Sequence, residues 1–392
     1  MHRLLTEQRQ VRYEEFTNFV ASNVEPDAET WERDQEIPGA VISLMAKSGY
    51  LGASLPREFG GQGWDTVTFG LLNEAFGRSS SSLTSVLTVQ AMVSMALLKW
   101  GTAAQKAVWL ARLASGETVA SFALTEPDAG SALQSLTTAF TRRPGSDFLV
   151  LNGSKRWITC AQRAGLFLVF GKLEQQSVAC LVPRETPGLE IEPIRELMGF
   201  RAAGLAQLTF TNAEVPVANV VGKPGFALSH IAPVGLHFGR ISTACSALGL
   251  LRGCFEVSTA YATERKIADR AVGELGMIRS LIARMGTDFK AASFLCYDAC
   301  QSEDDRAPEA FENALTAKYF TSRAAVNAAS DAVQIRGASG CHASSPTSRY
   351  YRSAKITEII EGTTQIHEDL LGKIFVGRAH APGGRSAAGA GV

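Results

Sequence analysis

A β-rich stretch divides this chain into three parts. Between Val119 and about Phe226, short apolar runs alternate with turn dipeptides such as Asn152-Gly153 and Pro187-Gly188. We predict strands at 119–124, 148–151, 166–170, 178–182 and 208–210. A small antiparallel sheet or barrel inside a longer helical chain limits the fold to a helical domain, a β domain and a second helical domain.

Both flanking parts have helical periodicity. In the first, a compact amphipathic run around Ile42 and a long run from Leu71 to Leu97 enclose a Gly-rich loop at 51–65. In the last, apolar residues recur every three or four positions from Leu275 to Phe289, as in a helix bundle. We predict an α+β protein, mainly α: an N-terminal helical domain at 1–118, a β domain at 119–227, a helical bundle at 228–378 and a disordered tail at 379–392.

Composition excludes several kinds of partner. Among 392 residues, Lys plus Arg and Asp plus Glu are both 38, so no basic excess favours nucleic acid or an anionic membrane surface. The chain starts without an apolar signal segment, and no uncharged apolar run reaches membrane-span length, so we expect a cytoplasmic protein. Seven cysteines without a Cys-x-x-Cys pair favour reduced thiols and no metal site, and no glycine fingerprint indicates a Rossmann NAD site.

The segment IIEGTTQI, residues 359–366, carries the strongest chemical signal. Glu361 follows two isoleucines, and burial beside them would raise its pKa and make it a general base near neutral pH. Gly362 permits close approach of a ligand, and groups that can hydrogen-bond an anion follow where a helix begins: Thr363, Thr364 and Gln365. The alternative is a Thr-capped helix start with Glu361 in a solvated loop. From this segment alone, a general base and a solvated Glu361 are equally supported.

Two loops of the β-rich stretch also bear chemistry. In SFALTEPDAGSAL, residues 121–133, hydroxyl and carboxyl groups surround a turn held open by Pro127 and Gly130. In LNGSKRWIT, residues 151–159, a turn leads to Trp157 and Thr159, which offer a flat aromatic face and a hydroxyl to a planar ring. Taken singly, each loop has an ordinary structural explanation, because polar turns and a Trp in a strand are common.

Five segments in order, however, resemble the FAD-dependent acyl-CoA dehydrogenases: ALTEPDAGS, LNGSKRWIT, MGFR with FTNAEVPVANVVG, AVQIRGASG and IIEGTTQI. The resemblance covers roughly Leu51 to Arg378. It implies a helical N-terminal domain, a central β-barrel, a C-terminal four-helix bundle, FAD as cofactor, and a homo-oligomer, commonly a tetramer. It also implies that Glu361 removes the α proton of an acyl thioester while the β hydrogen leaves as hydride to the flavin. Some members place the base just before the residue that matches Arg240; that position is Gly239 here.

The resemblance also implies the binding residues. Those for FAD are Phe122, Leu124, Thr125, Ser131, Trp157, Ile158, Thr159, Arg265, Thr363, Thr364 and Gln365, with Gln334, Ile335, Arg336, Gly337 and Ala338 of a neighbouring subunit. Those for substrate are Ser131, His237, Arg240 and Gly362.

The chain also departs from the family pattern. Ala268, Asp269 and Gly276 replace flavin-contact residues after Arg265, and Ala132 replaces an acidic residue. These departures suggest a divergent branch that acts on an acyl group tethered to a carrier protein in a specialised pathway.

Three classes of function follow. The first is dehydrogenation of an acyl thioester, on CoA or on an acyl carrier protein, with electrons passed to an acceptor such as an electron-transfer flavoprotein. The second is an oxygen-using oxidase or monooxygenase on the same fold. The third is a non-catalytic acyl-binding protein, which the retained Glu361 and both flavin loops argue against.

Overall fold

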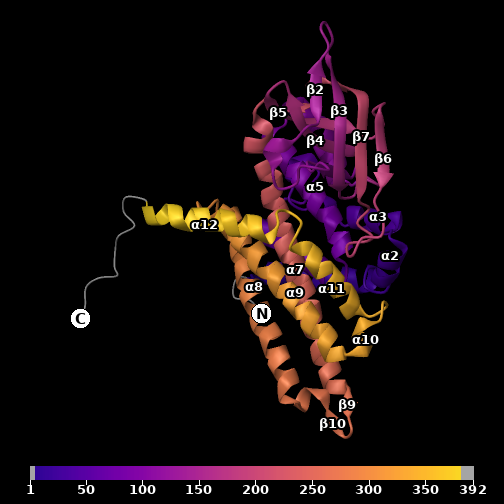
Figure 1. Cartoon of the computed structure of the whole chain (residues 1–392), viewed down its shortest axis with the longest axis vertical. Helices are drawn as coiled ribbons and strands as arrows, with labels where there is room; N and C mark the ends of the chain where they lie inside the picture. Colours follow the sequence, from indigo (N-terminus) through magenta and orange to yellow (C-terminus); the bar gives the residue numbers. More distant parts are fainter. Residues whose placement is uncertain (1–4, 381–392) are drawn as a thin grey trace, which may run out of the picture.

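The computed structural model describes residues 5–380, so the predicted tail at 379–392 lies almost wholly outside the described residues. Helices come first, a β-sheet follows, and long helices complete the chain (Figure 1). The sheet lies at one end of the molecule, the long helices extend from the other, and α12 projects away from the body (Figure 1). The predicted class and order of the three parts are confirmed.

Six helices form the N-terminal part: α1 Glu7–Asn23, α2 Ala28–Asp34, α3 Gly39–Lys47, α4 Thr66–Ser79, α5 Ser81–Trp100 and α6 Ala103–Ala114. The single run predicted from Leu71 to Leu97 is wrong, because it is two helices that meet at Ser80. Ser80 has extended backbone angles, and its hydroxyl accepts a hydrogen bond of 3.3 Å from the Leu83 amide. A serine in that conformation ends α4 and caps α5.

One eight-stranded sheet forms the middle part, in the order β6-β7-β3-β2-β4-β5-β8 with β1 also on β4. The strands are β1 Ala120–Ala123, β2 Ala139–Arg142, β3 Phe148–Ile158, β4 Leu166–Leu173, β5 Gln176–Pro183, β6 Leu189–Pro193, β7 Ala206–Pro216 and β8 Val220–Val221. The sheet is mixed rather than antiparallel, because β1 and β2 both pair parallel to β4. β1 opposes residues 166–169 and β2 opposes 172–173, so the two strands lie in line along one edge of β4. The loop 124–138 connects β1 to β2 and leaves the sheet between them.

The C-terminal part contains α7 Ala232–Glu264, α8 Gly276–Asp304, α9 Ala310–Arg336, α10 Ala338–Cys341, α11 Pro346–Thr357 and α12 Thr364–His380. A hairpin of β9 Lys266–Ile267 and β10 Arg270–Ala271 joins α7 to α8. The helices α7, α8 and α9 run side by side along the length of this part, with α11 against α9 (Figure 1).

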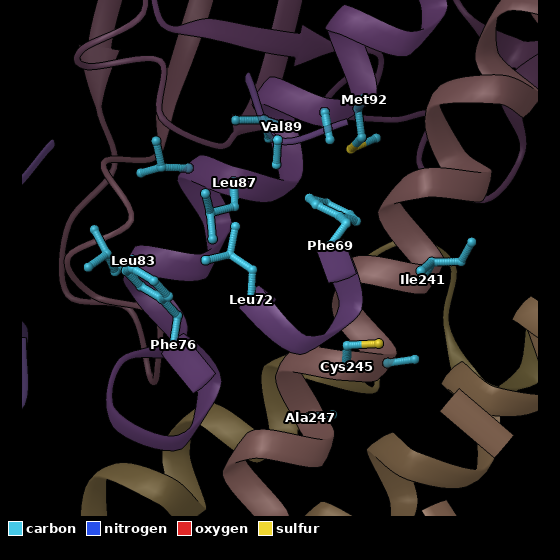
Figure 2. Packing of buried hydrophobic residues seen from close by; sticks show 14 of the residues in the cluster. Phe69, Leu72, Phe76, Leu83, Leu87, Val89, Met92, Ile241, Cys245 and Ala247 are labelled. Carbon is cyan, nitrogen blue, oxygen red and sulfur yellow. The ribbon is translucent and has the colours of Figure 1, made fainter. Parts of the chain in front are cut away.

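The N-terminal helices pack directly on α7. Phe69 and Phe76 of α4, Leu87 of α5 and Ile241 of α7 lie in one apolar cluster (Figure 2). Helices α4 and α7 approach closely because glycine separates their backbones: a Cβ at Gly249 would lie 2.0 Å from the Glu74 carbonyl oxygen. This contact fixes α7 relative to α4 and α5.

Two helical stretches, Ser81–Trp100 and Ala227–Glu264, are long and apolar enough to cross a membrane. The expectation that no run reaches this length is therefore wrong. In both, 89% of the apolar window is buried inside the protein, as in the core helices of a soluble protein.

Candidate active site

A cavity of about 590 Å³ lies where the three parts of the chain meet. Its walls come from α5, from the loops at 124–133 and 157–159, from residues 197–205, from α7 and from the segment 356–366. It contains residues from both loops of the β-rich stretch and from IIEGTTQI, which lie far apart in the sequence.

Glu361 lies between α11 and α12 and reaches across the cavity toward α7. A Cβ built on Gly239 would lie 2.4 Å from Glu361 Oε2 and 3.1 Å from Met92 Sδ, so the carboxylate occupies the space that a side chain at 239 would fill. Oε2 is buried and has no hydrogen-bond partner among the described residues. Burial raises the pKa of Glu361 to about 7, although the charges of Arg240 and Lys318 oppose that rise.

The backbone conformation, besides the flanking isoleucines, places this carboxylate. Ile359 is 52% exposed, whereas Ile360 is partly buried, and both line the cavity. The backbone turns at Glu361 with φ 54° and at Gly362 with φ 99°, and this turn directs the carboxylate toward Gly239. A glutamate in a solvated loop would not be placed in this way.

Three basic side chains hold the backbone around Glu361. Arg240 Nε donates to the Glu361 carbonyl oxygen at 3.3 Å, and Lys318 Nζ donates to the Gly362 carbonyl oxygen at 2.7 Å. His367 Nδ1 lies 3.0 Å from the Thr363 carbonyl oxygen, which can only accept, so Nδ1 carries the proton. Burial lowers the pKa of Lys318 to about 7 and that of His367 to about 4. Our sequence analysis missed Lys318 and His367.

The loops after β1 and at the end of β3 form the opposite wall. The Arg156 amide donates to the Thr125 carbonyl oxygen at 2.9 Å, which joins the two loops. Trp157 has a φ of 63°, is 46% exposed and lines the cavity, with the Arg156 guanidinium 4.9 Å from its ring centre. Flat faces from Phe122 and Trp157, with hydroxyls from Thr125 and Thr159, fit a planar ring system that has polar edges.

A buried ion pair fixes both loops. Glu126 accepts from Lys155 Nζ at 2.8 Å and from the amides of Thr137 and Thr138 at 2.7 and 2.9 Å, while Lys155 also donates to the Leu124 carbonyl oxygen at 3.0 Å. Burial would raise the pKa of Glu126, but its hydrogen bonds to Lys155 and the two threonines lower it to about 2. Burial lowers the pKa of Lys155 to about 8, and Glu126 opposes that shift. Both groups are therefore charged at neutral pH.

Lys155→Met should weaken this loop. Breaking a buried pair from one side leaves an uncompensated carboxylate and typically costs about 3–5 kcal/mol. We expect a lower melting temperature and loss of bound FAD on dialysis. Lys172→Met is the matched control, because Lys172 Nζ makes one exposed contact with the same loop, at 3.2 Å from the Gln134 carbonyl oxygen. Equal effects of the two variants would contradict the role of the buried pair.

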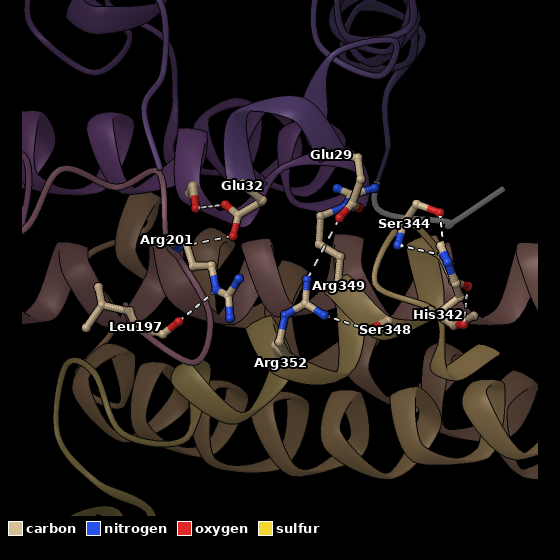
Figure 3. Close-up of polar contacts among 12 residues, drawn as sticks. Glu29, Glu32, Leu197, Arg201, His342, Ser344, Ser348, Arg349 and Arg352 are labelled. Atoms are coloured by element: carbon tan, nitrogen blue, oxygen red, sulfur yellow. Dashed lines mark hydrogen bonds and ion pairs between the residues drawn. The ribbon is translucent and has the colours of Figure 1, made fainter. Parts of the chain in front are cut away.

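A polar network holds the MGFR segment at the cavity rim. Glu32 Oε2 of α2 accepts from the Arg201 amide at 3.1 Å, and Arg201 Nε donates to the Leu197 carbonyl oxygen at 2.8 Å (Figure 3). Arg349 Nε of α11 donates to Glu29 at 3.0 Å in the same region (Figure 3). Leu197 lines the cavity, so these contacts position part of its wall.

The cavity brings together most of the residues predicted for the site, namely Phe122, Leu124, Thr125, Ser131, Trp157, Ile158, Thr159, Arg240, Glu361, Gly362 and Thr363. It does not include His237, whose Nε2 lies 2.8 Å from Glu303 of α8, nor Thr364 and Gln365 in the first turn of α12. It also lacks Arg265 and the segment 334–338. These lie together at the far end of the bundle, where the Tyr261 hydroxyl lies 3.5 Å from the Arg336 carbonyl oxygen.

Sequence reasoning also missed a polar face inside α5. Thr84, Ser85 and Thr88 line the cavity with Thr243 and Ser246 of α7. Hydroxyl residues spaced one turn apart in an otherwise apolar helix were the available signal.

Comparisons with known proteins agree with this geometry. Three family models match: acyl-CoA dehydrogenase N-terminal domain at 6–117, middle domain at 121–213 and C-terminal domain at 230–375. An acyl-CoA dehydrogenase of Bacillus subtilis is 35% identical over 92% of this chain and 96% of its own length. The short-chain specific acyl-CoA dehydrogenase of mouse mitochondria is 32% identical over 92% of this chain and 88% of its own.

Solved structures give the same result. A glutaryl-CoA dehydrogenase of Mycobacterium smegmatis in complex with FADH2 is 25% identical, with a TM-score of 0.91 and 97% of both chains covered. The prolyl acyl carrier protein oxidase AnaB is also 25% identical, with a TM-score of 0.90 over 95% of this chain and 99% of that one. A chain described with the electron transferring flavoprotein of Acidaminococcus fermentans is 31% identical, with a TM-score of 0.91 over 96% and 100%. The chain belongs to the acyl-CoA dehydrogenase family of FAD-dependent oxidoreductases.

Proposed function

We propose that the protein dehydrogenates an acyl thioester between its α and β carbons, with Glu361 as the base that removes the α proton. The observation that carries this proposal is the buried, unpartnered Glu361 Oε2 in a cavity that also contains both flavin loops. With a pKa of about 7, the carboxylate can take a proton and release it again near neutral pH.

The chain's own residues would divide the remaining work. Phe122, Leu124, Trp157 and Thr159 would hold the flavin ring, and FAD, when bound, supplies the hydride acceptor. Arg240 and Lys318 would keep the Glu361 backbone in place through its carbonyl and that of Gly362. Anaerobic bleaching of the flavin by a panel of acyl thioesters tests the proposal, and no bleaching by any of them would reject it.

We also propose that the natural acyl carrier is a carrier protein and that CoA is a weaker surrogate. The likeness to a prolyl acyl carrier protein oxidase supports this idea. A carrier protein would need a basic side chain at the cavity mouth, and the candidates are Arg195, Arg201, Arg240 and Arg336. Arg240 is buried in the cavity, Arg336 lies at the far end of the bundle, and Arg201 donates to the Leu197 carbonyl oxygen. Arg195 is exposed beside the rim segment and is the candidate that remains. Faster flavin reduction by the CoA ester than by the same acyl group on a cognate carrier, at every salt concentration, would reject this proposal.

Arg265 supports a further proposal, that the protein is a homo-oligomer. Gly239, which contacts the base, lies near the start of α7, and Arg265 directly follows the end of the same helix. The 26 positions between them place Arg265 roughly 40 Å from the base along the helix axis. In one copy it cannot reach the phosphates of an FAD whose ring lies in that copy's cavity, but a second copy could supply it. Arg265→Ala should then release FAD and shift the protein toward smaller species in light scattering. An unchanged flavin content and mass after extensive dialysis would contradict this role.

The electron acceptor distinguishes a dehydrogenase from an oxygen-using oxidase or monooxygenase. We propose an electron-transfer flavoprotein, which the likeness to the Acidaminococcus fermentans chain supports. Rapid reoxidation of the reduced flavin in air would instead favour an oxidase.

A further inference from the structure

Five hydroxyl residues line the inner end of the cavity, where α5 meets α7. Helix α5 contributes Thr84, Ser85 and Thr88, and α7 contributes Thr243 and Ser246. All five residues are buried. By contrast, the opposite rim includes the exposed residues Ser131, Trp157 and Ile359. The arm of an acyl thioester must leave through the rim, so the far end of the acyl chain must lie among the hydroxyls.

The contacts between α5 and α7 give the depth of this end. Thr88 Oγ1 lies 2.6 Å from Ser242 Oγ, and Thr84 Oγ1 lies 2.9 Å from Ser246 Oγ, so the two helices run in opposite directions. The Glu361 carboxylate lies at the level of Gly239. At a rise of about 1.5 Å per residue, Thr243 lies about 6 Å and Ser246 about 10 Å beyond that level.

The hydrogen bonds at this end leave one donor without an acceptor. Thr84 donates to the Ser81 carbonyl oxygen at 2.7 Å, so Ser246 must donate to Thr84, and the free lone pairs of Ser246 can still accept. Thr243 Oγ1 is buried without a hydrogen-bond partner in the described part of the chain. A threonine hydroxyl in a helix has two favoured rotamers, so it can turn toward a ligand. A ligand group that both donates and accepts would satisfy Thr243 and Ser246 together.

The charges of the cavity lining limit which ligand group can bind at the inner end. Of the described residues that line the cavity, only Arg240 and Glu361 are charged, and both lie at the level of Gly239. A carboxylate or ammonium group at the inner end would therefore be buried without a counter-charge. A plain alkyl chain would leave the Thr243 hydroxyl unpaired.

We propose that the substrate is an acyl thioester whose chain carries a neutral hydroxyl group at its far end, bound by Thr243 and Ser246. This inference rests on the proposed dehydrogenation. The hydroxyl oxygen of a 6-hydroxyhexanoyl chain lies five bonds, or roughly 6 Å, beyond the α carbon, which matches the level of Thr243.

The experiment compares pantetheine thioesters, so that the choice of carrier plays no part. The probes are 6-hydroxyhexanoyl, heptanoyl, which has the same number of heavy atoms in its acyl chain, and adipoyl, which ends in a carboxylate. Anaerobic flavin reduction gives the rate, and the flavin spectral shift in the Glu361→Gln variant gives the affinity without turnover. We expect 6-hydroxyhexanoyl to exceed heptanoyl in both by about tenfold, the worth of one or two neutral hydrogen bonds, and adipoyl to be the poorest.

Variants assign the preference to the two hydroxyls. Thr243→Val and Ser246→Ala should each reduce the preference for 6-hydroxyhexanoyl over heptanoyl by about three- to tenfold, and Thr243→Ser should keep it. Ser258→Ala is the matched control, because Ser258 also has a buried, unpartnered hydroxyl on α7 but does not line the cavity. Heptanoyl performing as well as 6-hydroxyhexanoyl would overturn the inference and leave the dehydrogenation intact. Failure of all three thioesters to reduce the flavin would overturn both.

Discussion

Replacing Glu361 with glutamine should slow flavin reduction by an acyl thioester at least ~100-fold while FAD stays bound. The amide keeps the shape of the side chain over Gly239 but cannot accept the α proton. Stopped-flow reduction under anaerobic conditions measures the rate, and the absorbance ratio of flavin to protein measures retention. Glu358→Gln is the matched control, since Glu358 precedes the same loop and pairs with Lys355 at 2.6 Å but does not line the cavity. Turnover near the wild-type rate in Glu361→Gln would remove the assigned base.

The same carboxyl group determines a pH dependence. Because the pKa of Glu361 is raised from 4.5 to about 7, the wild-type rate should rise with pH through about 7. Between these values the folded protein holds a proton that the unfolded chain releases, so the free energy of unfolding should fall as pH rises from 4.5 to 7. Glu361→Gln should abolish that decrease in a series of denaturant titrations.

Lys318→Met should have the second largest effect. Lys318 is fully buried, and its charge lowers the pKa of Glu361, so its removal should raise that pKa and move the midpoint of the rate profile to higher pH. The variant also leaves the Gly362 carbonyl oxygen without its donor, and a lost hydrogen bond from a charged group costs about 1.5–3 kcal/mol. We expect the rate at pH 7 to fall at least tenfold, measured by anaerobic flavin reduction across a pH series.

Stability provides an independent readout for Lys318. Its pKa is lowered from 10.5 to about 7, so the unfolded chain binds a proton that the folded protein has released between these values. The free energy of unfolding of the wild type should therefore rise with pH in this window, and the variant should lose that rise. Lys373→Met, which removes an exposed Lys on α12, is the control. A rate profile with an unmoved midpoint would contradict the electrostatic role.

The sequence predicted the order of the three parts because helical and strand periodicity depend on local pattern alone. It did not predict the break at Ser80, although the four consecutive serines at 79–82 are helix-capping residues, because the apolar residues on either side continue at helical spacing. The prediction of an antiparallel sheet was also wrong, because the sequence pattern of one strand does not indicate which strand it pairs with or in which direction. Parallel pairing of β1 and β2 with β4 depends on how the loop 124–138 returns to the sheet.

Within the site, sequence motifs were more informative for loops than for helices. Glu361 and Trp157 belong to short motifs that can be identified in the sequence without knowing how the chain folds. Lys318, His367 and Thr243 lie singly on long helices, and which face of α9, α12 or α7 is turned toward Glu361 depends on packing between distant segments. A lone Lys in a helix is usually exposed, so nothing in the pattern marked Lys318 as buried.

Because β1 and β2 lie in line on one edge of β4, the sheet is anchored separately from the loop that lines the cavity. Both ends of the loop 124–138 are anchored to the same strand, about three residues apart along it, or roughly 10 Å. The sheet register is therefore set by β4 both before and after the loop. Insertions, deletions or grafts between Pro127 and Leu136, which keep the buried contacts of Glu126 with Lys155, Thr137 and Thr138, can alter what the cavity accepts without displacing a strand, so this part of the loop is a suitable place to exchange specificity between relatives.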